Sequence, residues 1–100
     1  MSFQLVFTPR AQTDLHSLEF APNKKDPVKL SKVRKCLGLL EINPKHPGLH
    51  THEYTSLNGS KGEKVWEAYV ENKTPAAWRV FWHYGEGKGV ITILAITPHP

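Results

Sequence analysis

The sequence predicts an α+β domain in which two N-terminal helices pack on one face of a twisted, antiparallel sheet. Two stretches with helical spacing of apolar residues, each introduced by a proline, fill most of the first 42 residues. Three alternating or continuous apolar stretches follow between residues 63 and 97. A chain of 100 residues has room for one core, so we expect residues 1–100 to form a single domain with the order β-α-α-β-β-β.

The N-terminal part is expected to hold one strand and both helices. Alternation over residues 3–7 predicts a short strand, and Thr8-Pro9 then supplies an N-cap and a proline for the first helical turn. Apolar residues at spacings of three and four predict a first helix over residues 9–19. Asp26-Pro27 starts a second helix in the same manner, and it ends before Asn43-Pro44.

The C-terminal part is expected to hold three strands, over residues 63–71, 77–84 and 90–97. The last strand is almost wholly apolar, which favours a central place in the sheet. Residues 43–62 have an irregular composition, and a structureless stretch of that length indicates either a function or a further element. Since two helices cover only one face, the face that carries Arg79 is expected to be open.

Composition excludes several classes of protein. Cys36 is the one cysteine, so the chain has no internal disulfide and no cysteine-rich zinc site. No apolar run approaches the roughly 20 residues that span a bilayer, and the first ten residues do not read as a signal peptide. We therefore expect a cytoplasmic protein without a membrane partner. We also expect no cofactor and no metal, with solvated loop histidines at positions 46, 50 and 52.

Positive charge is concentrated in the first half of the chain. The net charge is +4, and residues 1–50 hold eight basic and four acidic side chains, whereas residues 51–100 hold five of each. A solvated helix face is the commoner reason for a short basic run, but such a patch also suits an anionic partner, most often nucleic acid. The residues of the patch expected to contact such a nucleic acid are Lys24, Lys25, Lys29, Lys32, Arg34 and Lys35.

A family resemblance extends over essentially the whole chain, and four segments carry it. They are the strand-to-helix segment 7–11, the acid-to-Leu-to-Gly segment 52–59, the strand Trp-Arg-Val-Phe-Trp-His-Tyr at 78–84, and the apolar strand with a final histidine at 91–100. In this order they resemble the RelE/ParE superfamily of toxins from type II toxin–antitoxin systems, most closely the RelE/YoeB-like mRNA interferases. The resemblance implies a RelE-like fold, a cognate antitoxin as partner, and ribosome-dependent cleavage of mRNA by an endoribonuclease.

The same resemblance implies a set of catalytic residues. Glu53 matches the carboxylate of the YoeB-like branch, Arg79 the strand arginine, and His99 the histidine near the C-terminus. Metal-independent RNA cleavage needs a base for the 2′-hydroxyl, a cation for the charge that develops on the phosphate, and an acid for the 5′-oxygen. Glu53 and His99 are expected to be the base and acid, Arg79 the cation, and the three are expected to meet in one concave site.

Four further residues are expected to contact RNA. Lys61 and Lys64 would contribute positive charge from the edge of the loop. Phe81 and His83 share the predicted face of Arg79, where Phe81 would stack on a base and His83 would bind a phosphate.

Two departures from the ribonuclease pattern leave other functions open. The stretch Trp66–Tyr69 lacks the basic residues usual in ribonucleolytic members, and Pro100 stands where a tyrosine is usual. The superfamily also contains ParE-type members, which inhibit DNA gyrase and lack the catalytic set. The alternatives are therefore a ParE-like inhibitor with DNA gyrase as partner, an inactive homologue that mainly binds its antitoxin, and a small RNA-binding module.

Overall fold

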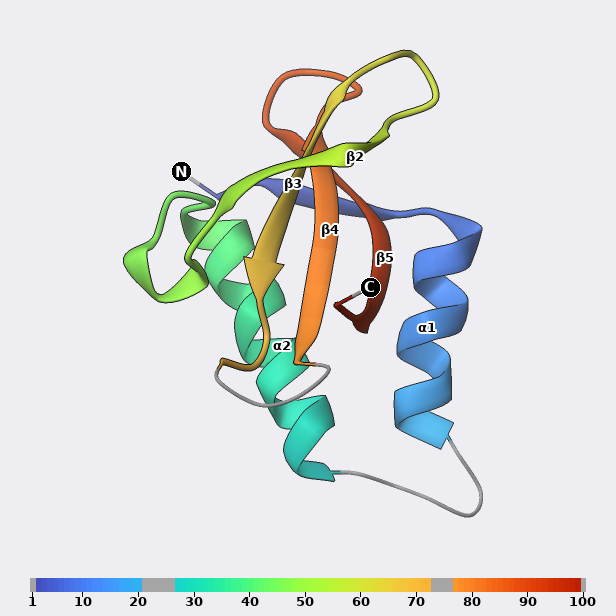
Figure 1. Ribbon diagram of the computed structural model, residues 1–100, viewed down its shortest axis with the longest axis vertical. Helices are drawn as coiled ribbons and strands as arrows, with labels where there is room; N and C mark the ends of the chain where they lie inside the picture. Colours follow the sequence, from blue (N-terminus) through green and yellow to red (C-terminus); the bar gives the residue numbers. More distant parts are fainter. Residues whose placement is uncertain (1, 21–26, 73–76, 100) are drawn as a thin grey trace.

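The structure, a computed structural model, describes residues 2–20, 27–72 and 77–99. Within these residues, five strands form one sheet in the order β1-β5-β4-β3-β2, with helices α1 and α2 packed against it (Figure 1). The elements along the chain are β1 Gln4–Phe7, α1 Pro9–Phe20, α2 Pro27–Ile42, the 3₁₀ helix η1 Pro47–Leu49, β2 His52–Asn58, β3 Lys64–Tyr69, β4 Trp78–Tyr84 and β5 Val90–Pro98.

Helix α1 starts at the predicted cap and is tied to the sheet by side-chain hydrogen bonds. The Thr8 hydroxyl accepts a hydrogen bond from the amide of Ala11 at 3.1 Å and donates one to the carbonyl of Leu94 at 3.1 Å. One turn later, the Asp14 carboxylate accepts the backbone amide of Ile96 at 2.9 Å. The cap and this acid therefore attach the helix to β5.

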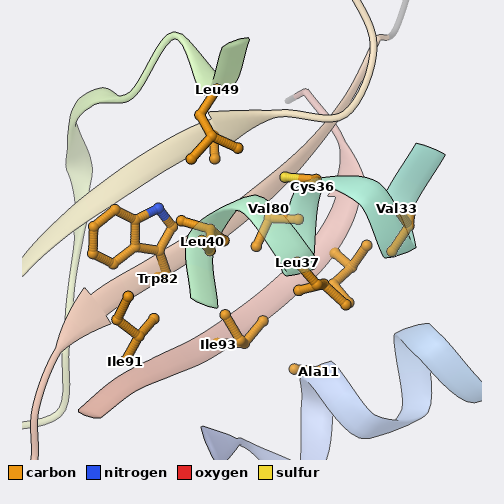
Figure 2. Packing of buried hydrophobic residues seen from close by; sticks show 12 residues of the cluster. Ala11, Val33, Cys36, Leu37, Leu40, Leu49, Val80, Trp82, Ile91 and Ile93 are labelled. Carbon is orange, nitrogen blue, oxygen red and sulfur yellow. The ribbon is translucent and has the colours of Figure 1, made fainter. Parts of the chain in front are cut away.

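The main core lies between the helices and one face of the sheet, which we call the helix-side face. Trp82 and Ile93 from the strands meet Leu40 from α2, and all three are fully buried (Figure 2). Ala11 from α1 and Leu37 from α2 close the same cluster, which explains the apolar spacing of both helices. The prediction of an α+β fold with two helices on one face is confirmed.

Two features of the sheet differ from the prediction. Strand β1 pairs with β5 in parallel, so the sheet is mixed and not wholly antiparallel, because the chain crosses over through the helices before it returns. Residues 43–62 contain η1 and a further strand, β2, at the edge of the sheet. Most β2 side chains are exposed, which leaves no apolar alternation to read in the sequence.

The other face of the sheet, which we call the open face, carries a smaller apolar cluster of Val65, Phe81 and Ala95. Among the described residues, the buried polar or charged side chains are Glu67, Arg79 and His83, and strand alternation puts all three on this face. Neither described helix is long and apolar enough to cross a membrane.

Candidate functional site

A buried carboxylate between two histidines forms the centre of the open face. Glu67, on β3, is 1% exposed. Its Oε1 lies 2.5 Å from Nε2 of His52, and its Oε2 lies 3.1 Å from Nε2 of His99. The side chains of His52 and His99 are 48% and 43% exposed, so the acid is covered by two imidazoles that solvent can reach.

Two contacts hold the ring of His52 in place. Nδ1 of His52 lies 2.8 Å from the carbonyl oxygen of His50, which can only accept, so Nδ1 donates in this contact. Nε2 lies against the Glu67 carboxylate. The ring is therefore fixed by the backbone at one nitrogen and by Glu67 at the other.

Strand pairing brings these residues together from distant parts of the sequence. His52, the first residue of β2, lies opposite Glu67 in the antiparallel β2–β3 pair. His99 follows the last residue of β5, and its backbone amide donates to the carbonyl of Ala77 at 2.9 Å, just before β4. Tyr54 shares the open face with His52, and its ring lies 6.3 Å from that of His99 and 4.8 Å from that of Phe81.

Arg79 is a buried cation on the same face. It is 8% exposed, its Nη1 donates to the carbonyls of Glu71 and Trp78 at 2.6 and 3.0 Å, and its guanidinium lies 3.7 Å above the ring of Tyr69. Its Nε has no hydrogen-bond partner. Within residues 2–20, 27–72 and 77–99, no carboxylate forms an ion pair with it. Burying a charge without a counter-charge costs free energy, so this position favours an anionic ligand.

Tyr69 connects Arg79 to the histidines. Arg79 lies opposite Tyr69 in the β3–β4 pair, and the ring of His52 meets the Tyr69 ring edge-on at 5.7 Å. Glu67 and Tyr69 are two residues apart on one strand, which puts Glu67 diagonally across from Arg79 with about 7 Å between Cα atoms. The open face thus presents a cation and a carboxylate–imidazole cluster as one continuous site.

Glu53 does not join this site. It lies opposite Trp66, whose side chain packs toward the helix-side core, so Glu53 projects to the other face from Arg79 and His99. The expected convergence of these three residues is therefore not observed, and the carboxylate that lies beside His99 is that of Glu67. Alternation along β3, in which Trp66 and Ala68 face the helices, was the sequence signal that could have found Glu67.

Of the four further residues expected to contact RNA, most are buried or paired with other residues of the chain. Phe81 lies on the open face as predicted, but it is 3% exposed beneath Tyr54, which leaves little ring surface for a base. His83 is also buried, with Nδ1 2.9 Å from the Tyr84 carbonyl and Nε2 3.9 Å from Glu63. The remaining two are Lys61, paired with Glu86 at 2.7 Å, and Lys64, exposed at the start of β3.

The predicted basic patch on α2 is largely paired with acids of the same chain. Lys29 and Lys32 lie 3.6 and 3.8 Å from the Glu71 carboxylate, and Lys29 also lies 4.8 Å above the Trp78 ring. Arg34 pairs with Glu19 at 3.1 Å, Lys35 is exposed, and Lys24 and Lys25 lie outside the described residues. The described part of the patch therefore offers less free positive charge than the sequence predicts.

Two titration shifts follow from local contacts outside this cluster. The pKa of the Glu63 carboxyl lies below its usual value because its own backbone N–H and that of Lys61 donate to it. Burial raises the pKa of the Cys36 thiol to about 12, so it is an unreactive core residue.

In the part of the chain that the structure describes, no three His, Cys, Asp or Glu side chains are arranged to hold a metal ion.

Comparisons with known proteins identify the fold. No protein-family model and no curated protein sequence matches the chain, but solved structures do. A YoeB/ParE toxin from Agrobacterium tumefaciens has a TM-score of 0.70 at 12% identity, with 97% of this chain and 99% of that chain covered. The chain has the RelE/YoeB toxin fold.

Further structures with the RelE/YoeB fold agree with this assignment. YoeB from Staphylococcus aureus, solved as a dimer, has a TM-score of 0.67 at 15% identity, and both chains are covered completely, at 100%. A chain of the archaeal RelE–RelB complex from Pyrococcus horikoshii has a TM-score of 0.63 at 18% identity, with 98% and 96% covered. At these identities, the similarity establishes the arrangement of the elements and leaves function to the side chains of this chain.

Proposed function

We propose that this protein is the toxin of a type II toxin–antitoxin system and cleaves mRNA on the ribosome as a metal-independent endoribonuclease. The observation that carries the proposal is the open face itself, where the buried Arg79, which forms no ion pair with any described carboxylate, lies beside the Glu67–His99 pair. A buried cation next to an imidazole, which can accept and donate protons, suits cleavage of a phosphodiester.

The reaction can be written with the residues of this face. His99, oriented by Glu67, takes the proton of the 2′-hydroxyl, and the 2′-oxygen attacks the adjacent phosphorus. The bond from phosphorus to the 5′-oxygen breaks, and that oxygen takes a proton from solvent water. The products are a 2′,3′-cyclic phosphate and a 5′-hydroxyl. The side chain of His99 is 43% exposed, so His99 can release the proton it took to solvent before the next turnover.

Arg79 and a neighbouring cavity would position the RNA. Arg79 would stabilise the negative charge on the phosphate oxygens, an electrostatic contribution that needs a fixed donor, and stacking on Tyr69 fixes it. A cavity of about 300 Å³ beside the site is lined by Tyr54, Phe81 and Arg10. Its size and the exposed edge of Tyr54 suit a nucleobase next to the scissile bond.

Two macromolecular partners follow from this function. The ribosome would present the mRNA to the open face. A cognate antitoxin would neutralise the toxin by covering the open face. Support comes from the solved structures of similar fold that are complexes of this kind, RelE–RelB from Pyrococcus horikoshii and DinJ–YafQ from Escherichia coli.

The test combines growth with the chemistry of the cut ends. Induced expression should arrest growth, and the purified chain should cut mRNA on programmed ribosomes to give 2′,3′-cyclic phosphate ends. His99→Asn should lower cleavage by about 10²–10⁴-fold, because it removes a general acid–base group. His16→Asn, a change at an exposed histidine of α1, is the matched control and should cleave as the natural chain does.

Other outcomes would decide against the proposal. Growth arrest with intact mRNA and a DNA-damage response would instead support a DNA gyrase inhibitor. Absence of growth arrest would remove both toxin functions and leave a binding module.

A further inference from the structure

A second cavity lies apart from the candidate site, on the helix-side face of the sheet. Its volume is about 560 Å³, within the range of small-molecule sites. The loop around η1 supplies Lys45, His46 and His50, and the sheet supplies Trp66 and Tyr84. Neither Glu67, Arg79 nor His99 lines it, so it is a separate site.

The floor of this cavity is a pair of aromatic rings held by the core. Trp66 stacks on Trp82 with ring centroids 6.3 Å apart and planes 28° apart, and Tyr84 meets Trp82 edge-on at 4.9 Å. Since Trp82 is completely buried, it fixes both rings in place. Tyr84 is nevertheless 41% exposed, which is high for an aromatic residue that serves the core alone. The floor is therefore a preformed stacking surface for a planar ligand.

The rim of the cavity offers hydrogen-bond donors and positive charge. Nδ1 of His46 accepts the backbone amide of Gly48 at 2.9 Å, so a neutral His46 carries its proton on Nε2 and can donate there. Lys45 adds an ammonium group, and none of the described residues that line the cavity is acidic. Burial raises the pKa of the Tyr84 phenol, which keeps its hydroxyl a donor. A planar ligand that also carries an anionic group complements this combination.

We propose that this cavity binds a nucleotide, with the base on Trp66 and Tyr84 and the phosphate at Lys45 and His46. A free mononucleotide and one nucleotide of a single-stranded RNA both carry a base and a phosphate, so either could be the ligand. His50 links the cavity to the candidate site, because it lines the cavity while its ring lies 5.0 Å from Tyr69, on which Arg79 stacks. The proposal goes beyond RNA cleavage and does not depend on it.

The test measures nucleotide binding in a chain that is not expected to cleave. The full-length His99→Asn variant is titrated with the four 5′-mononucleotides, followed by calorimetry and by quenching of tryptophan fluorescence. Adenosine and ribose 5-phosphate, which each lack one half of the ligand, should bind about tenfold or more weakly than the mononucleotide. A factor of ten corresponds to the loss of about 1.4 kcal/mol of binding free energy.

Two substitutions locate the bound nucleotide. Lys45→Gln should weaken mononucleotide binding by about tenfold through the phosphate, and Tyr84→Leu should do so through the base. Lys88→Gln, at an exposed lysine in the β4–β5 turn, is the matched control and should bind as the parent does. Circular dichroism checks that each variant is folded.

The outcomes show whether the site binds a nucleotide and whether that nucleotide is free or part of an RNA strand. A short single-stranded RNA that displaces the mononucleotide and binds more tightly would make the cavity a subsite for the RNA strand. Mononucleotide binding without competition by RNA would make it a site for a free nucleotide. No binding at millimolar concentration would overturn the proposal. Binding that is unchanged in Lys45→Gln and Tyr84→Leu but lost in Arg79→Gln would also overturn it. Since the titrated chain lacks His99, failure here leaves the nuclease function untouched.

Discussion

The two faces of the sheet differ in what they bury. The helix-side face buries large apolar side chains such as Trp82, Ile91 and Ile93 under two helices. The open face buries a carboxylate and a guanidinium, Glu67 and Arg79, around an apolar cluster of three residues. Burial of apolar area stabilises a fold, whereas burial of charge costs free energy unless a partner compensates it.

This difference separates stability from function within one small sheet. Figure 1 shows both helices packed against the sheet, in which β2 is an edge strand. The first residue of β2, His52, lies opposite Glu67 of the open face. The helix-side face can therefore supply most of the stability, and the open face can retain costly polar groups for binding and chemistry. The predictions below test this division from the largest expected effect to the smallest.

The largest effect is expected in the helix-side core. Trp82→Ala should lower the free energy of unfolding by about 3–5 kcal/mol, because it removes a fully buried ring that supports Trp66 and Tyr84. Urea unfolding followed by circular dichroism measures this loss. Phe81→Ala, in the smaller cluster of the open face, should cost less. Equal losses would contradict the idea that the two faces contribute unequally to stability.

On the open face, Arg79→Gln should affect activity and not stability. RNA cleavage should fall by about 10²–10³-fold with the loss of a fixed cation. The free energy of unfolding should stay level or rise, because the substitution removes a buried charge that no carboxylate of the described residues pairs with. Arg79→Lys should restore little activity, since an ammonium group cannot stack on Tyr69 as a planar guanidinium does. A large drop in the thermal midpoint of Arg79→Gln would make Arg79 a structural residue.

A smaller effect is expected on the outer surface of α2. Gly38 is an exposed helical residue, and an added Cβ would meet no atom within 4 Å. Gly38→Ala should therefore raise the free energy of unfolding by about 0.5–1 kcal/mol. Gly59, in the turn beside the open face, should respond in the opposite direction, because its Cβ would lie 2.3 Å from Oε1 of Glu63. Chemical denaturation of both variants tests the contrast.

The smallest effect concerns the turn between β2 and β3. The pKa of Glu63 is lowered in the folded protein, so its carboxylate stabilises the fold above its ordinary value of 4.5 and loses this effect as the pH falls through the lowered value. Glu63→Gln should thus lower the thermal midpoint slightly at neutral pH. The gap between the variant and the natural chain should close in acid. A gap that persists in acid would mean that the charge of Glu63 is not its cause.

The elements of the fold that rest on local signals could be predicted from the sequence. The prolines at positions 9 and 27 and the apolar spacing placed both helices within a residue or so of their observed bounds. Alternation also assigned Arg79 to the open face of β4. Strand β2 escaped prediction because an exposed edge strand need not alternate. The parallel pairing of β1 with β5 depends on contacts between the two ends of the chain, which no local pattern encodes.

For the same reason, only part of the candidate site could be predicted from the sequence. Arg79 and His99 were identified from family resemblance, and both lie on the open face. Which carboxylate lies beside His99 could not be predicted, since choosing between Glu53 and Glu67 requires the β2–β3 register, in which His52 faces Glu67. The sequence did not show that Lys29 and Lys32 of the basic patch form ion pairs, because their partner Glu71 lies some forty residues away in the sequence.

The most direct test compares the two carboxylates, one on each face. Glu67→Gln keeps the size of the side chain but removes the carboxylate that lies against His52 and His99. It should lower RNA cleavage on programmed ribosomes by about a hundredfold or more, while Glu53→Gln cleaves as the natural chain does. Loss of cleavage in Glu53→Gln with full cleavage in Glu67→Gln would contradict the assignment of the chemistry to the open face.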